Sequence, residues 1–340
     1  MEKRSTVHGM KLFAAAALVA LVGVSGCDKS RGESKKLANE GIAALGRKQS
    51  ETAIEKLQKA TQAWGDNHSA WYYLGGAYMQ RNDWDKSSDA FQHAVDQAPE
   101  QAMYQMWYGI TLYKRAIENA RKEQASRENK KPEEIDPDLT AVNFQKPLQH
   151  LQEAVKLNGD LWRAHYYLGC VYRDSDEPKK AAEELSKAIS SGPSDPAPWI
   201  ALGELYRKWD FSKEALEIAR QGVEIVPGGN DKSDIYYVLG MAYDDTRSED
   251  KAIEAFTDAL EAKSDNHKAK FQRGQALFRK GDFAKAKKDL EEFSKSGGAS
   301  MEFTKQQAQK MLLDIAAKSA SAGAPTEKLS PEDLVKKGKG

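Results

Sequence analysis

Four similar stretches recur along the chain: WYYLGGAY from Trp71, HYYLGCVY from His165, WIALGELY from Trp199 and YYVLGMAY from Tyr236. Their starts are separated by 94, 34 and 37 residues, and a 34-residue period with insertions of 26 and 3 residues accounts for all three intervals. Periods of about 20–50 residues are typical of solenoids, in which each repeat is one supersecondary unit that stacks on its neighbours. The sequence therefore predicts an array of repeats.

Each repeat carries two apolar patterns. When the unit is numbered from 1 to 34, apolar or small residues occupy positions 4, 7, 8 and 11, which form one face of a helix, and positions 20, 24 and 27 form the face of a second helix. A proline at position 32 ends the second helix because it cannot continue it. In the unit that begins at His68 these residues are Trp71, Leu74, Gly75, Tyr78, Ser87, Phe91, Ala94 and Pro99.

The pattern W-x2-L-G-x2-Y…A-x3-F…P resembles the tetratricopeptide repeat. The resemblance implies an all-α, right-handed superhelical solenoid of about seven helix-turn-helix units over residues 35–300. We expect an insertion at about 114–146 in the third unit, a capping helix over 301–320 and a disordered tail over 321–340. The seven units begin at Ser34, His68, Ala102, Trp162, Pro196, Ser233 and His267.

The N-terminus has the features of an export signal. Residues 1–26 contain a basic start and then about 13 uncharged residues, too few to span about 30 Å of hydrocarbon. The segment ends in VSGC, which resembles the lipobox of bacterial lipoproteins. That resemblance implies lipidation of Cys27, with residues 27–34 as a short tether. The alternative is an ordinary export signal beside a chance cysteine, and Asp28 does not decide between inner and outer membrane.

A second set of helix positions is a candidate for partner binding. In tetratricopeptide proteins, positions 2, 5, 9 and 12 of the first helix line a concave groove. Position 5 is apolar or aromatic from the second unit to the seventh, which suits a protein interface. The alternative is that these side chains pack against the next unit. The candidate groove residues are Tyr72, Met106, Tyr113, Arg163, Tyr166, Arg173, Ile200, Glu204, Arg207, Tyr237, Asp244 and Phe271.

Composition and motifs argue against several other functions. The chain has 51 Lys and Arg against 51 Asp and Glu, so it lacks the basic excess of a nucleic-acid-binding protein. HExxH, paired CxxC and P-loop motifs are absent. His165 replaces the tryptophan at position 4, which favours a structural role, and Cys170 is a weak candidate for a reactive thiol. We expect no enzymatic activity, no cofactor, no metal and no small-molecule substrate.

The sequence therefore predicts a lipid-anchored scaffold of the bacterial cell envelope, facing the periplasm or exterior. It would bind protein partners of the envelope through its groove. A pilotin-like role in type IV pilus secretin assembly is one alternative, and an adaptor for envelope proteases or peptidoglycan hydrolases is another. A clamp for chaperone tails is disfavoured because position 9 carries no asparagine. The insertion is either a solvated excursion or an arm that contacts a partner.

Overall fold

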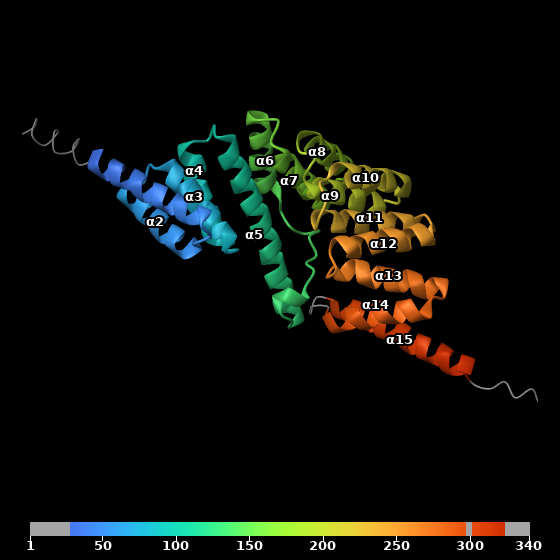
Figure 1. Ribbon diagram of the computed structural model, residues 1–340. Coiled ribbons are helices and arrows are strands. Elements are labelled where there is room, and N and C mark those ends of the chain that lie inside the picture. The colour runs from blue at the N-terminus through green and yellow to red at the C-terminus, as the bar shows by residue number, and fades with distance from the viewer. Residues whose placement is uncertain (1–27, 297–300, 324–340) are drawn as a thin grey trace, which may run out of the picture. The chain divides into compact units, whose positions relative to one another are not determined.

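The predicted all-α repeat solenoid is confirmed. The computed structural model describes residues 28–296 and 301–323, which form helices joined by short connections (Figure 1). The expected signal sequence over residues 1–26, Cys27 and residues 324–340 of the expected tail lie outside the described residues. Among the described helices, none is long and apolar enough to cross a membrane.

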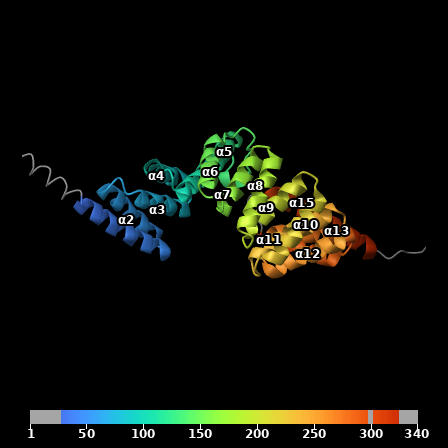
Figure 2. The same ribbon diagram turned by 90° about the horizontal axis from the view of Figure 1, so that it is seen from above.

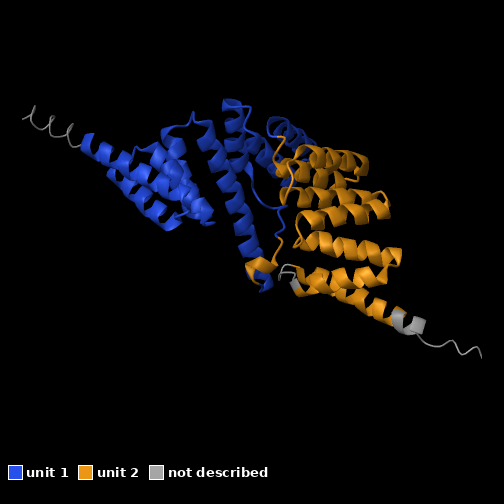
Figure 3. Ribbon diagram, viewed as in Figure 1, with its two compact units in different colours: residues 1–130, 137–192 blue, residues 131–136, 193–340 orange. Residues whose placement is uncertain are grey.

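The chain divides into two compact units, which we describe separately (Figure 3). Of the described residues, unit 1 contains 28–130 and 137–192, and unit 2 contains 131–136, 193–296 and 301–323. After a helix over residues 28–46, the helices of unit 1 are α2 (Ser50–Ala63), α3 (His68–Gln80), α4 (Trp84–Gln97), α5 (Ala102–Glu128), α6 (Gln145–Leu157), α7 (Trp162–Asp174) and α8 (Pro178–Ser191). The helices of unit 2 are α9 (Pro196–Lys208), α10 (Ser212–Ile225), α11 (Asp231–Asp245), α12 (Glu249–Ala262), α13 (His267–Lys280), α14 (Phe283–Ser296) and α15 (Glu302–Gly323), with a 3-10 turn η1 (Pro132–Glu134).

Each repeat contributes one pair of helices, which we call A and B. The A helices are residues 28–46, α3, α5, α7, α9, α11 and α13, and each is followed by its B helix. Figure 1 shows α11, α12 and α13 lying side by side, and Figure 2 shows the same helices from above; α11 packs extensively on α12, and α12 on α13. α15 packs on α14 and α13, which is the place expected for a capping helix.

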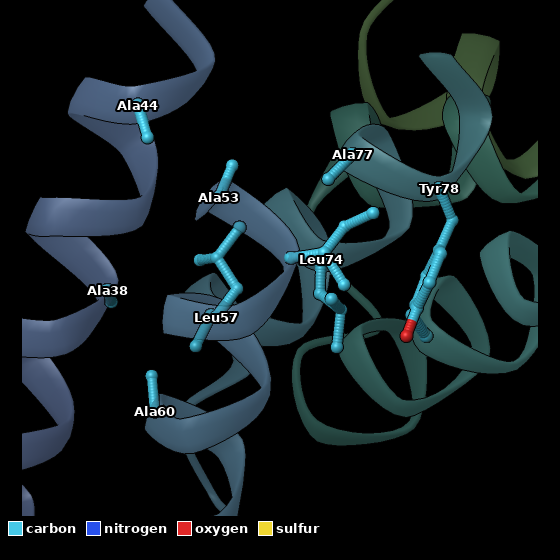
Figure 4. Close-up of a cluster of buried hydrophobic side chains, with 11 residues drawn as sticks. Ala38, Ala44, Ala53, Leu57, Ala60, Leu74, Ala77 and Tyr78 are labelled. Atoms are coloured by element: carbon cyan, nitrogen blue, oxygen red, sulfur yellow. The ribbon is translucent and has the colours of Figure 1, made fainter. Parts of the chain in front are cut away.

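Alternating small and large residues bring the two helices of a repeat together. Phe91 of α4 is 1% exposed, and a Cβ at Gly75 of α3 would lie 2.8 Å from its ring. In the first repeat, Leu57 of α2 is fully buried beside the alanines of the helix over residues 28–46, and Leu74 of α3 packs from the other side (Figure 4). Only glycine at position 8 allows this approach, as the sequence pattern indicates.

A hydrogen-bond network is repeated in both units. Asn67 caps α3 by accepting from the amide of Ala70 at 3.1 Å, and its Nδ2 donates to Ser34 Oγ at 2.9 Å. Ser34 Oγ in turn donates to the carbonyl of Ala60, near the end of α2, at 2.7 Å. The same bonds recur in unit 2, where Asn266 and Ser233 take these places. Each network joins the start of one repeat to the start of the next.

The turns between A and B helices use a left-handed residue at position 15. In the second, fourth and fifth repeats this residue is Asn82, Asp176 or Asp210, which tolerate that conformation. Lys48 and Arg247 adopt it at φ of 60° and 57°, although their side chains do not favour it. Position 15 is therefore set by the turn, and two repeats carry a strained residue there.

The expected tether and insertion have a definite structure. The helix over residues 28–46 already includes most of the segment expected as a tether, and its Ser34 is fully buried. α5 continues to Glu128, well beyond the 13 residues of α3 or α7. The chain then returns along α5, where Gln124 accepts from the amide of Asp138 and Phe144 lies 5.5 Å from the ring of Tyr113. Within unit 1, the end of the insertion is thus folded against its own repeat.

Candidate partner-binding faces on the A helices

The A helices contact one another through the predicted groove positions. Tyr72 of α3 stacks on Tyr104 of α5, with 4.6 Å between ring centroids. Tyr113 of α5 donates to Asp174 Oδ2 of α7 at 2.6 Å. These residues link successive A helices, and Tyr72 also meets the ring of Phe91 on the B helix α4, with 5.7 Å between ring centroids. We call the residues at positions 2, 5, 6, 9, 12 and 13 of the A helices the A face.

Three of the predicted groove residues are core residues. Met106, Tyr113 and Phe271 are 2%, 3% and 5% exposed, so they cannot contact a partner in this arrangement. Phe271 packs against Phe293 of α14, with 5.1 Å between ring centroids. For these positions the alternative interpretation, packing against neighbouring helices, is the correct one.

Tyr113 and Arg173 belong to a hydrogen-bond network within the A face of unit 1. Burial raises the pKa of Tyr113, so its hydroxyl stays protonated and donates to Asp174. Arg173 Nε donates to the other oxygen of the same carboxylate at 2.8 Å. The thiol of Cys170 is also buried, and burial raises its pKa, so it is not a thiolate at neutral pH. This cluster has a structural role.

In unit 2, two of the three predicted charges, Arg207 and Asp244, are paired within the chain. Arg207 of α9 binds the carboxylate of Asp245 of α11 through Nε at 2.6 Å and Nη2 at 3.2 Å. Asp244 of α11 pairs with Arg279 of α13. In both pairs, position 12 of one repeat meets position 13 of the next. Position 13 was not among the predicted positions, and its repeated charges at Asp174, Asp245 and Arg279 are the signal that could have revealed it.

The other predicted groove residues remain at the surface. Tyr72, Tyr166, Ile200, Glu204 and Tyr237 are half-buried, and Arg163 is exposed, its guanidinium 4.4 Å from the centroid of the Trp162 ring. Burial raises the pKa of Tyr72 to about 12, so its hydroxyl is neutral over the working pH range. A partner can reach these six residues, and also the paired Arg173, Arg207 and Asp244, which are partly exposed.

The histidine at position 4 performs the same task as the tryptophans that it replaces. Trp71 and Trp199 donate Nε1–H to a carbonyl six residues earlier, at 2.7 and 2.8 Å. His165 places Nε2 at 3.0 Å from the carbonyl of Gly159, and its Nδ1 is 2.6 Å from Glu184 Oε2. Its position and contacts are structural. No cluster of three or more metal-ligating side chains occurs in the described ranges.

Comparison with known proteins agrees with this architecture. The tetratricopeptide repeat profile matches residues 39–102 and 233–299. A curated relative, the general transcriptional corepressor trfA of Dictyostelium discoideum, is 28% identical over 112 residues. That match covers 33% of this chain but only 8% of the relative, so the chain spans a small part of the relative's length.

Several solved structures share the fold. A tetratricopeptide repeat protein from Parabacteroides merdae superimposes with a TM-score of 0.56 at 12% identity, covering 84% of this chain and 99% of that one. Pseudomonas aeruginosa PilF gives a TM-score of 0.51 at 17% identity, covering 72% and 96%. Yeast Tom70 gives 0.53 at 14% identity, covering 88% and 57%. At these identities the similarity establishes the fold alone.

The repeat profile, the shared fold and the helix pairing lead to one conclusion. The chain is a solenoid of tetratricopeptide repeats, an architecture that typically serves as a scaffold for protein interactions.

Proposed function

We propose that this protein is a lipid-anchored scaffold of the bacterial cell envelope that binds a protein partner through its A face. The observation that carries the partner-binding part is the accessible set of aromatic and charged residues on the A helices, which includes Tyr72, Tyr166 and Tyr237. Aromatic residues and arginine are enriched where binding energy is concentrated in protein interfaces. Within each unit, successive A helices carry these residues side by side, which suits an extended segment of a partner.

The membrane part of the proposal rests on the N-terminal sequence. The signal-like segment ends at Cys27, and only six residues separate Cys27 from the fully buried Ser34. Even in an extended conformation these residues span at most about 25 Å, so the first repeat would work close to the bilayer. Stable anchoring requires two or more acyl chains, as the diacyl or triacyl modification of a bacterial lipoprotein would supply.

The anchor is tested by replacing Cys27 with Ala in the full-length chain. We expect the wild-type protein to stay with the membrane fraction until detergent is added and to incorporate a clickable fatty acid. The C27A protein should incorporate none and should keep its uncleaved signal, since cleavage in such proteins follows lipidation. Equal fatty-acid labelling of both proteins would refute the anchor at this residue.

Partner binding is tested by crosslinking and affinity capture from native membranes. Arg163→Glu and Glu204→Lys change the A face at two residues that make no ion pair among the described residues. Lys213→Glu and Glu224→Lys are matched controls, because they reverse the same charges on the B helix α10. A partner that is lost with the first pair and kept with the second supports the proposal. A partner that is captured equally by all four variants shows that another surface binds it.

A narrower role in secretin assembly is a second candidate. Signal, lipobox and stacked repeats together resemble the pilotin-like lipoproteins, and the fold similarity to PilF is compatible with that role. Seven repeats and the insertion in the third repeat depart from that more compact group. Loss of secretin multimers in a deletion strain is the expected result, and normal multimers would dismiss this candidate. Altered turnover of envelope proteins would instead favour an adaptor for proteases or hydrolases.

A further inference from the structure

The helix over residues 28–46 has a charged surface where the later repeats are apolar. At positions 3 and 10 the second repeat has Ala70 and Ala77, which are fully buried in an apolar cluster with residues of the preceding B helix, α2. The first repeat has Lys36 and Ala43 at these positions, and both are exposed. A further repeat packed on this surface would remove the Lys36 ammonium from water, which is unfavourable. The surface is therefore suited to a polar partner.

A cavity of about 710 Å³ opens on this surface, between the first helix and α2. Both helices place hydrogen-bond donors around it. These donors are the side chains of Lys36, Asn39 and Arg47 on the first helix and of Thr52 and Lys56 on α2. The rest of the lining is Glu40, Ala43 and Ala44, so three bases face one acid. We call these eight lining residues the end face.

The one acid of the end face is already bound. Glu40 Oε2 accepts from Lys56 Nζ at 2.8 Å. Lys56 lowers the pKa of Glu40 through this hydrogen bond and through its charge, and the charge of Lys36 lowers it further. Lys36 and Arg47 themselves make no ion pair among the described residues. Two positive charges of the end face are therefore available to an anion from outside the chain.

The end face lies beside the proposed anchor. The first helix includes residue 28, directly after Cys27, so acyl chains on Cys27 would hold that end of the helix at the bilayer. Lys29, Lys36 and Arg47 are 7 and 11 residues apart, which places them along one side of the helix. At 1.5 Å per residue they extend over about 27 Å. Positive charges spread over this length match an anionic surface better than a single small anion.

We propose that the end face docks on the anionic phospholipid headgroups of the membrane that holds the anchor. The inference rests on the proposed function and adds a second membrane contact to it. Lys36 and Arg47 bind headgroup phosphates through charge-assisted hydrogen bonds, and the first helix lies parallel to the bilayer surface. The acyl anchor keeps the end face near the headgroups, so a contact that is weak alone becomes effective.

The test uses the mature chain from residue 27 onward with Cys27→Ser, which carries no acyl chain. Its binding to vesicles is measured by co-sedimentation. We expect it to bind vesicles of phosphatidylcholine mixed with phosphatidylglycerol and not vesicles of phosphatidylcholine alone. Binding should weaken as sodium chloride is added, because the charge attraction is screened. Equal binding to both kinds of vesicle, or binding to neither, would overturn the proposal.

Paired charge reversals locate the contact. Lys36→Glu with Arg47→Glu should weaken binding to the anionic vesicles by about tenfold or more. Arg127→Glu with Lys179→Glu is the matched control, because it makes the same change of charge at exposed residues of α5 and α8 and should leave binding unchanged. Both pairs should keep the urea midpoint of unfolding, since all four side chains are exposed. Equal loss of binding in the two pairs would show that total charge, and not the end face, attracts the chain.

A soluble anion could use the same chemistry as a headgroup phosphate. Sodium phosphate and sodium chloride at equal ionic strength should therefore be compared as competitors for the anionic vesicles. We expect equal displacement of the chain, because screening alone weakens the contact. Much stronger displacement by phosphate would identify a site for a soluble anion and would refute docking on the bilayer.

The proposed function and this inference can fail separately. If the clickable fatty acid labels Cys27 but the C27S chain does not bind anionic vesicles, the anchor stands and the end face has no role at the membrane. If the C27S chain binds as expected but the wild type incorporates no fatty acid, the end face binds anionic lipid and the proposed anchor fails.

Discussion

Two adjacent glycines of α3 provide a sharp test of the packing described above. Gly75 faces α4, where a Cβ would lie 2.8 Å from Cγ of Phe91 and 2.9 Å from both Cδ atoms. Gly76 faces away, where a Cβ would meet nothing within 4 Å. Replacing each with alanine makes the same chemical change at neighbouring positions of one helix. We expect opposite effects on stability.

The magnitudes follow from the two environments. Replacing glycine with alanine inside a helix contributes about 1 kcal/mol of stability through backbone entropy. At Gly76 nothing opposes this gain. At Gly75 the added carbon is closer to the Phe91 ring than ordinary contacts allow, and the ring is 1% exposed and cannot swing out. Overpacking of this kind costs about 1–3 kcal/mol, so after the gain of about 1 kcal/mol the net loss at Gly75 is up to about 2 kcal/mol.

The assay is urea unfolding followed by helical circular dichroism. Because both variants alter the unfolded chain in the same way, the difference between them isolates the packing contribution. We expect Gly76→Ala to exceed Gly75→Ala in stability by about 1–3 kcal/mol, the cost of overpacking alone. Equal stabilities, or a more stable Gly75→Ala, would show that α3 and α4 are not held as close as described.

Three further predictions concern single residues. Asn266→Ala removes a helix cap and the donor to Ser233 Oγ, and should lower the unfolding free energy by about 2–3 kcal/mol. The exposed cap variant Asp83→Ala should lower it by about 1 kcal/mol or less in the same unfolding assay. Arg247→Gly removes the strain of a side chain at a left-handed backbone position and should raise the unfolding free energy by about 1 kcal/mol. A lower unfolding free energy would show that Arg247 is not strained there. The hydrogen bond to Glu184 raises the pKa of His165. The stability that protonated His165 contributes to the fold is therefore complete below about pH 6.5 and is lost as the pH rises through the raised pKa. Unfolding free energies of the wild type measured against pH should show this decline, and the same decline in His165→Gln would show that His165 is not its cause.

Much of the fold could be predicted from the sequence because the constraint repeats. Gly75 and Phe91 occupy positions 8 and 24, and the same small-large pairing recurs in Gly240 with Phe256. The A and B helices approach each other in the same way in each repeat, so the pattern found in one repeat predicts the packing of the others. The left-handed turn at position 15 was harder to predict. Asn82 is a residue type that favours this conformation, but Arg247, at the same position of another repeat, is not.

The candidate site was harder to predict because it depends on contacts between repeats. Tyr113 has the residue type and position of a groove residue, but α5 and α7 approach closely and Phe144 of the insertion lies against its ring. Likewise, Arg207 could be identified as a groove charge, but its pairing with Asp245 depends on how far successive A helices are displaced. The pattern within one repeat does not contain these distances.

The hydrogen bonds among Ser34, Asn67 and Ala60 also determine how the first two repeats resist a mechanical force. A pull on the N-terminal end of the helix over residues 28–46 reaches Ser34 early in that helix. The hydrogen bonds there pass the force to the end of α2 and the start of α3 at once. The first helix therefore cannot peel away one turn at a time without breaking bonds to two other helices. Tension applied at that end therefore loads the first two repeats together at this junction.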